Sequence, residues 1–239
     1  MTREIITGQN ASIKLGVIDS QIGSVRTGEE TETAVRVIDH GCVGVASAVG
    51  KADLDALTHR AREGLSFEID YPVKPGGPTQ LHTVHDGVHR TVDELVELTN
   101  HVLGSLREAF PNFVYSHGVE QTTVGWRYEN DNGLDLSYRR TGLDMSFVIK
   151  EKGSGNIFDT YVTASGPDVD PDEVVERFSE HLSAISTPAG DLPTGPQRIV
   201  MPGIDGHAAA TLVKLFRSDL VARPYQTGAS VFSGKVGTG

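Results

Sequence analysis

Residues 33–48 read TAVRVIDHGCVGVASA, in which apolar residues alternate with polar or small ones on both sides of His40-Gly41. The side chains of a strand point alternately to its two faces, so this period of two predicts strands over Thr33 to Asp39 and Val43 to Ala48. The dipeptide between them favours a tight turn. The stretch therefore predicts a β-hairpin.

The same alternation is present upstream of this hairpin. Ile13, Leu15 and Val17 share one side of a period-two pattern, and Ser20-Gln21 can turn the chain into a strand over Ile22 to Arg26. We therefore expect this part of the chain to form a meander of short strands.

Two helices and one irregular connection are expected next. Residues 51–64 place apolar residues at helical spacing and end in a glycine, which is a common helix stop. The stretch Tyr71 to Thr91 carries three prolines and two glycines over 72–78, so we expect a long surface connection there. Thr91 and Glu94 then form a capping box, which predicts a helix over 91–110.

The following residues return to a strand pattern. Between 112 and 164 the period of two is interrupted by turn signals at 131–133, Thr141-Gly142 and 153–156, which predicts three or four antiparallel strands. A helix over 171–186 follows, with proline at its first position. The predicted fold class is α+β, a largely antiparallel twisted sheet or pair of sheets with helices 91–110 and 171–186 packed on one face.

A domain boundary is expected near residue 190. Residues 188–197 contain three prolines and two glycines, and a short strand and a helical pattern over 206–221 follow them. We therefore expect an N-terminal α+β domain over 1–190 and the beginning of a second domain over 197–239.

Composition excludes several classes of protein. The 239 residues carry 32 acidic and 21 basic side chains, a formal net charge of −11, which makes nucleic acid and anionic membranes poor partners. The single cysteine, Cys42, allows no intrachain disulfide and suits a reducing compartment. No segment has the length and apolarity of a signal peptide core or a membrane span, so we expect a cytoplasmic protein.

Three histidines in the irregular connection are candidate metal ligands. His82, His85 and His89 lie close in sequence, and imidazole is a ligand that zinc prefers. A strand would put His82 and His85 on opposite faces, and solvated loop histidines are the favoured alternative.

Three aromatic residues of the strand region are candidates for packing or for binding. Trp126, Tyr128 and Tyr138 can pack as cross-strand aromatics, or can form an exposed stripe that binds peptide. The period of two does not decide which face they occupy.

Two stretches carry a resemblance to a known family. The hairpin of residues 35–47 followed by the helix from Asp53 is one of them. The other is QTGASVFSGKVG, residues 226–237, with Gly228, Ser230, Gly234 and Gly237 at the motif positions. Together they resemble the TldD/PmbA family, whose order of elements is similar along the whole chain.

The resemblance is to the metal-free branch of that family. TldD-like members carry a zinc-binding H-E-x-x-x-H sequence before the glycine and serine element. Here Val213 and Ser218 stand at the two histidine positions, and Lys214 stands at the glutamate position. Valine has no lone pair to donate, serine is a weak zinc ligand, and lysine repels the cation. The chain therefore resembles the branch named PmbA or TldE.

The resemblance implies a non-catalytic subunit of a cytosolic peptidase assembly that degrades or trims unfolded peptides. No cofactor is expected in this chain, and zinc is expected only in a TldD-like partner. The peptide substrate would be held as an added strand on a sheet edge. Family members are nearly twice as long, so we expect this chain to be a fragment or a shortened homologue with a truncated second domain.

Two other functions stay open at this point. One is a peptide-binding or self-assembling module, a homo-oligomer without a peptidase partner. The other is an independent metalloenzyme that uses His82, His85 and His89.

Overall fold

One seven-stranded sheet and three α-helices make up the described part of the protein. The structure is a computed structural model, and it describes residues 1–71, 74–187 and 195. The strands are β1 (Thr2–Ile18), β2 (Gln21–Asp39), β3 (Cys42–Val49), β4 (Thr79–His85), β5 (Phe113–Asn130), β6 (Leu134–Glu151) and β7 (Thr160–Gly166). The helices are α1 (Leu54–Gly64), α2 (Val92–Ala109) and α3 (Pro171–Ser186), with a short 3-10 turn η1 (Leu65–Phe67) after α1. The strand order is β3-β2-β1-β5-β6-β4, and β7 also pairs with β6.

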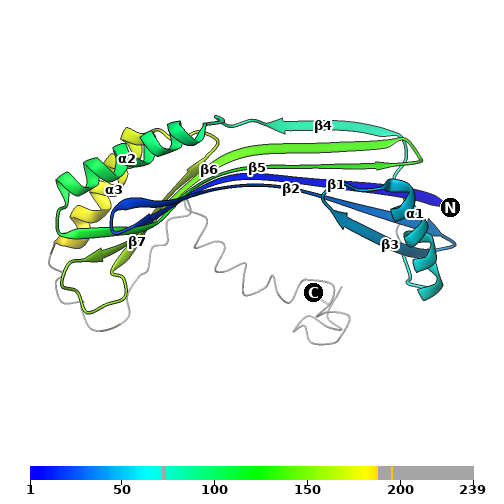
Figure 1. The fold of residues 1–239 in the computed structure, drawn as a ribbon, viewed down its shortest axis with the longest axis horizontal. Coiled ribbons are helices and arrows are strands. Elements are labelled where there is room, and N and C mark those ends of the chain that lie inside the picture. The colour runs from blue at the N-terminus through cyan, green and yellow to red at the C-terminus, as the bar shows by residue number, and fades with distance from the viewer. Residues whose placement is uncertain (72–73, 188–194, 196–239) are drawn as a thin grey trace. The chain divides into compact units, whose positions relative to one another are not determined.

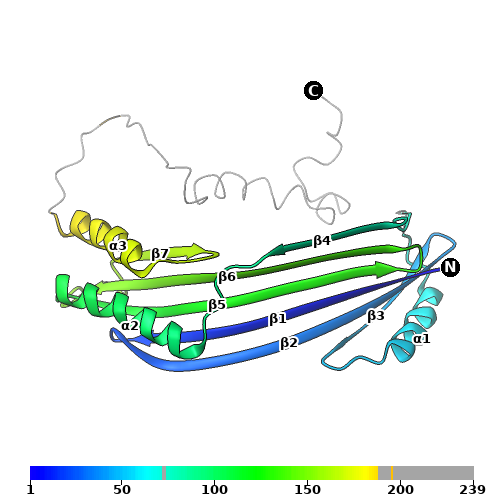
Figure 2. The same ribbon diagram turned by 90° about the horizontal axis from the view of Figure 1, so that it is seen from above.

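The predicted hairpin is confirmed, but the strands upstream are longer than expected. β2 and β3 pair antiparallel around His40-Gly41, where both residues have positive φ. β1 and β2 pair along their whole lengths, from Thr2 opposite Ile38 to Ile18 opposite Gln21. The predicted meander is present, because β1, β2 and β3 are consecutive antiparallel neighbours. The expectation of short strands is wrong, because β1 and β2 are two long strands that form one ribbon with a turn at Asp19-Ser20 (Figure 2).

Two further predictions are corrected by the sheet. β4 lies inside the stretch expected to be irregular, and it pairs in parallel with residues 134–140 of β6. The prolines and glycines of residues 72–78 precede this strand, so they do not interrupt its hydrogen bonds. Thr141-Gly142 is not a turn, because β6 continues through it opposite Thr122 and Thr123.

Local side chains cap the starts of the three α-helices. The Asp53 side chain accepts hydrogen bonds from the first backbone N–H groups of α1, and Asp170 does the same for α3. Thr91 and Glu94 form the expected capping box at the start of α2. These contacts satisfy backbone donors that a helix start leaves without partners.

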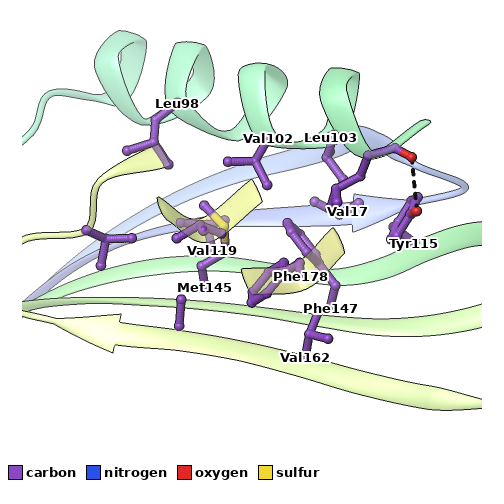
Figure 3. Packing of buried hydrophobic residues seen from close by; sticks show 14 of the residues in the cluster. Val17, Leu98, Val102, Leu103, Tyr115, Val119, Met145, Phe147, Val162 and Phe178 are labelled. Carbon is purple, nitrogen blue, oxygen red and sulfur yellow. Dashed lines mark hydrogen bonds between the residues drawn. The ribbon is translucent and has the colours of Figure 1, made fainter. Parts of the chain in front are cut away.

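The larger apolar core lies under α2 and α3. Phe147 of β6 is fully buried and makes edge-to-face contacts with Tyr115 and Phe178, whose ring centroids lie 6.4 and 6.1 Å away. The Tyr115 hydroxyl donates to the Leu106 carbonyl at the end of α2, and burial raises the pKa of Tyr115 to about 12 (Figure 3). These contacts hold both helices on the sheet.

A smaller core lies under α1. Leu57 and Ala61 pack against apolar residues of β1 and β2, namely Ile5, Val35 and Val37. Gly44 of β3 permits this approach, since a Cβ there would lie only 1.8 Å from the Ala61 carbonyl oxygen. The glycine is therefore required by the contact between helix and strand.

Both cores lie on the same face of the sheet. Ile5 belongs to the smaller core and Leu15 and Val17 to the larger, and the alternation of side chains puts all three on one side of β1. α2 and α3 cover one end of the strands and α1 lies at the other end (Figures 1 and 2). The predicted α+β class, with a largely antiparallel sheet and helices packed on one face, is confirmed.

No helix among the described residues is long and apolar enough to span a bilayer. The second domain expected over 197–239 lies outside the described residues, as does the boundary expected at 188–197 apart from residue 195.

We predict that Phe147→Ala lowers the free energy of unfolding by about 3 to 5 kcal/mol, because it leaves a cavity between two aromatic rings. Urea denaturation followed by circular dichroism measures this change. Phe158→Ala is the control, because Phe158 is exposed and its truncation is expected to change stability by less than about 0.5 kcal/mol. Equal effects of the two substitutions would contradict the placement of this core.

Candidate functional site

The three candidate histidines do not converge in the structure. His82 Nδ1 lies 2.8 Å from Ser137 Oγ on the face that carries the helices. His85 lies on the opposite face, where its ring is 5.7 Å from that of Tyr138. His89 lies beyond β4, with Nδ1 3.3 Å from the Gln121 side-chain nitrogen. Among the described residues no group of three histidine, cysteine or acidic side chains could hold a metal ion.

The segment that carries His89 is fixed by a buried glutamine. Gln121 accepts a hydrogen bond from the backbone N–H of Arg90 and donates one to its carbonyl. The Arg90 guanidinium in turn contacts Asp168 at 2.6 Å, and this hydrogen bond holds the pKa of the Asp168 carboxyl below its ordinary value. These bonds join the β4–α2 connection to the start of α3, which makes them structural contacts.

The face of the sheet on which no described helix packs carries an aromatic row. Trp126 of β5 stacks on Tyr138 of β6, with 6.1 Å between ring centroids and 26° between planes, and His85 contacts the same tyrosine. Trp126 is 43% exposed. Cross-strand packing is therefore confirmed for Trp126 and Tyr138, and the tryptophan remains partly exposed on this face. Aromatic side chains held in this way can contact a bound peptide or partner.

A buried carboxylate lies near one end of this row. Glu4 is 1% exposed and accepts a hydrogen bond from the Tyr128 hydroxyl, while the Arg36 guanidinium lies 3.8 Å from its second oxygen. Burial, and next the bond to Glu4, raises the pKa of the Tyr128 hydroxyl above its ordinary value. The tyrosine therefore stays a proton donor throughout the physiological range.

The outer edge of β3 offers unpaired backbone groups. The N–H of Val43 points away from β2 and donates to the Ile69 carbonyl. The alternation of an antiparallel strand directs the N–H and C=O groups of Val45, Ser47 and Val49 the same way, and they have no backbone partner in the part of the chain that the structure describes. This edge also lacks the lysines and prolines that commonly protect edge strands.

The β7 edge differs, because side chains of α3 contact it. Arg177 donates to the Thr163 carbonyl, and His181 Nε2 lies 2.9 Å from the Thr160 hydroxyl. β4 is the strand at the other end of the order. The β3 edge is a place where an added strand can pair, because Val45, Ser47 and Val49 direct backbone groups outward there.

Known structures with a similar arrangement are found by comparison of folds. TldE from Thermococcus kodakarensis matches with a TM-score of 0.61 and 16% identity, over 76% of this chain and 44% of that one. A putative modulator of a DNA gyrase from Thermotoga maritima matches with a TM-score of 0.57 and 13% identity, over 81% and 46%. Another, from Bacteroides thetaiotaomicron, matches with a TM-score of 0.51 and 15% identity, over 76% and 45%.

The described residues share the fold of TldE. At these identities the likeness concerns the fold alone, and this chain spans less than half the length of each of the three structures. No protein-family model and no curated protein sequence matches the chain. The expected resemblance in fold to the PmbA and TldE branch is thus confirmed.

The motif positions that carried the sequence resemblance lie outside the described residues. This holds for Val213, Lys214 and Ser218, and for the four positions of the glycine and serine element. Their assignments stay predictions. Sequence reasoning missed the open β3 edge and the buried Glu4, although the absence of lysine and proline from residues 42–49 was a usable signal for the edge.

We predict a pH-dependent loss of the Arg90–Asp168 contact. Because the pKa of Asp168 is lowered in the folded protein, its stabilising contribution is full above the ordinary aspartate pKa and is lost as the pH falls through the lowered value. Asp168→Asn should therefore lower the urea midpoint at pH 7 and change it little at about pH 2. Asp144→Asn, at an exposed site on β6, is the control and should have little effect at either pH.

Proposed function

We propose that this chain is a non-catalytic, metal-free subunit of a cytosolic TldD/PmbA-type peptidase assembly that acts on unfolded peptides or modified-peptide precursors. The observation that carries the proposal is the fold shared with TldE, which agrees with the branch that the sequence motifs resemble. The fold by itself does not establish an activity, so the argument depends on the residues that follow.

The sequence supports a subunit without its own metal. Val213, Lys214 and Ser218 occupy the positions of the zinc ligands and the general base, and they supply neither. In the described residues the three candidate histidines lie apart. We therefore assign the chemistry to a TldD-like partner, where a bound zinc would activate water and a glutamate would move the proton.

The role left to this chain is to hold the peptide. Val45, Ser47 and Val49 direct outward N–H and C=O groups that have no backbone partner among the described residues, so an extended peptide can add to β3 as a further strand. Main-chain hydrogen bonds do not depend on the peptide sequence, which suits a broad range of unfolded substrates. The Val45 and Val49 side chains are 53% and 67% exposed and can contact every second side chain of such a peptide.

The same open edge favours a second candidate function. An unprotected edge strand can pair with another copy of itself, so the chain can act as a peptide-binding or self-assembling module without a peptidase partner. Pull-down of the full chain separates the two functions, because recovery of a TldD-like zinc protein favours the first and recovery of the chain alone favours the second.

We predict that the chain alone holds no stoichiometric zinc and hydrolyses no unfolded peptide. Its mixture with a TldD-like zinc protein should contain zinc and hydrolyse the peptide. Metal analysis and a fluorogenic peptide assay measure the two properties. The partner tested alone is the control. Stoichiometric zinc together with hydrolysis by this chain alone would falsify the proposal.

We predict that Ser47→Pro prevents addition of a peptide strand at β3. The substitution removes an outward N–H while leaving the hydrogen bonds to β2 in place, so the protein is expected to fold. Peptide binding, measured by fluorescence anisotropy of a labelled unfolded peptide, should be lost. Ser47→Ala keeps the backbone donor and should bind as the wild type does. Unchanged binding by a folded Ser47→Pro variant would place the peptide elsewhere.

A further inference from the structure

A glycine in the interior of β1 has no structural explanation within the described residues. Gly8 pairs with Glu32 of β2 and Trp126 of β5 in regular register, without a bulge. It does not have positive φ, and a Cβ at this position would meet no atom within 4 Å. Glycine weakens a strand interior, and where no bend or bulge needs it, it often marks the close approach of a ligand or another chain.

The missing side chain leaves a notch on the face opposite the described helices. Paired residues of neighbouring strands point to the same face, so Glu32, Gly8, Trp126 and Tyr138 form one row across four strands. Strands lie about 4.8 Å apart, which separates the Cα atoms of Glu32 and Trp126 by about 10 Å with only a hydrogen atom between their side chains. A planar group fits in this space.

The two sides of the notch differ in chemistry. The indole of Trp126 is partly exposed, and stacking on Tyr138 fixes its plane. Glu32 is exposed and makes no ion pair or hydrogen bond within the part of the chain that the structure describes. An aromatic face attracts a cation, and a free carboxylate accepts two parallel hydrogen bonds from a guanidinium.

The charges nearby favour a cation on this side of Trp126 only. Glu30 lies next to Glu32 on the same face of β2, and it is also exposed and unpaired among the described residues. The cationic Arg140 lies on β6, on the other side of Trp126. A basic group is therefore attracted to the space over Gly8, and the net charge of −11 assists its approach.

We propose that the notch over Gly8 binds an arginine side chain of a partner peptide, with the guanidinium between the Trp126 indole and the Glu32 carboxylate. Arginine combines a planar cation that stacks on an aromatic face with a fork of donors that matches a carboxylate. The site needs neither zinc nor a peptidase subunit, so it stands apart from the function proposed above.

The only tryptophan of the chain reports on the site directly. The probe is an N-acetylated, C-amidated Gly-Gly-Arg-Gly-Gly peptide, titrated to about 10 mM, since a single side chain contact gives weak affinity. The matched probe carries citrulline, which has nearly the shape of arginine without its charge. We expect a saturable change in Trp126 fluorescence with the arginine peptide and none with the citrulline peptide.

Three variants locate the binding. Gly8→Val fills the notch and is expected to fold at least as stably as the wild type, because valine suits a strand and has open space there. It should abolish the saturable change. Gly8→Ala should weaken binding, and it replaces Gly8→Val in the test if the valine variant fails to fold. Glu32→Gln should raise the Kd about two- to five-fold, as for an exposed ion pair. Glu29→Gln is the matched control, on the opposite face of the same strand.

Four results would overturn the proposal. The first is equal binding of the arginine and citrulline peptides. The second is unchanged binding by a folded Gly8→Val variant. The third is an effect of Glu29→Gln as large as that of Glu32→Gln. The fourth is the absence of any saturable change with the wild-type chain.

Discussion

The unbroken register between β1 and β5 is the constraint on which the rest of the described structure depends. The two strands pair without a slip from Glu4 opposite Asn130 to Val17 opposite His117. A shift of one residue would turn the side chains of β5 and β6 to the other face relative to those of β1 and β2, so the larger apolar cluster, which draws on both pairs of strands, would lose its partners. The same register puts Trp126 opposite Gly8, on the face that the described helices leave open. One ladder therefore determines where the larger core forms and where a partner can approach.

Elements with a local chemical signal could be predicted from the sequence. His40-Gly41 predicted the hairpin, Thr91 with Glu94 predicted the start of α2, and Pro171 predicted the start of α3, because each signal acts on the backbone within a few residues of itself. The fold class followed from these elements and from the period of two between residues 112 and 164.

Features that depend on distant partners could not be predicted in this way. β4 is a strand because residues 134–140 of β6, about fifty positions later, provide its hydrogen bonds. Thr141-Gly142 has the composition of a turn, but its neighbours on β5 keep it extended. The exposure of Trp126 depends on which face the helices cover. Alternation along one strand shows which residues share a face, but it does not show which of the two faces is covered. The candidate metal site has the same explanation. His82 and His85 lie on β4, whose alternation puts them on opposite faces, and the local sequence predicted an irregular connection there instead of a strand.

The two apolar clusters share one face but no residue, and the positions between them on β1, among them Thr7 and Gln9, are polar. Only the strand ladder connects the core beneath α1 with the core beneath α2 and α3. The two ends can therefore open in separate steps, because loosening one cluster exposes no apolar surface of the other. In native-state hydrogen exchange the amides of α1 and β3 would then become unprotected at lower denaturant concentration than those of α2. The amides in the middle of β1 would lose protection together with those of α2.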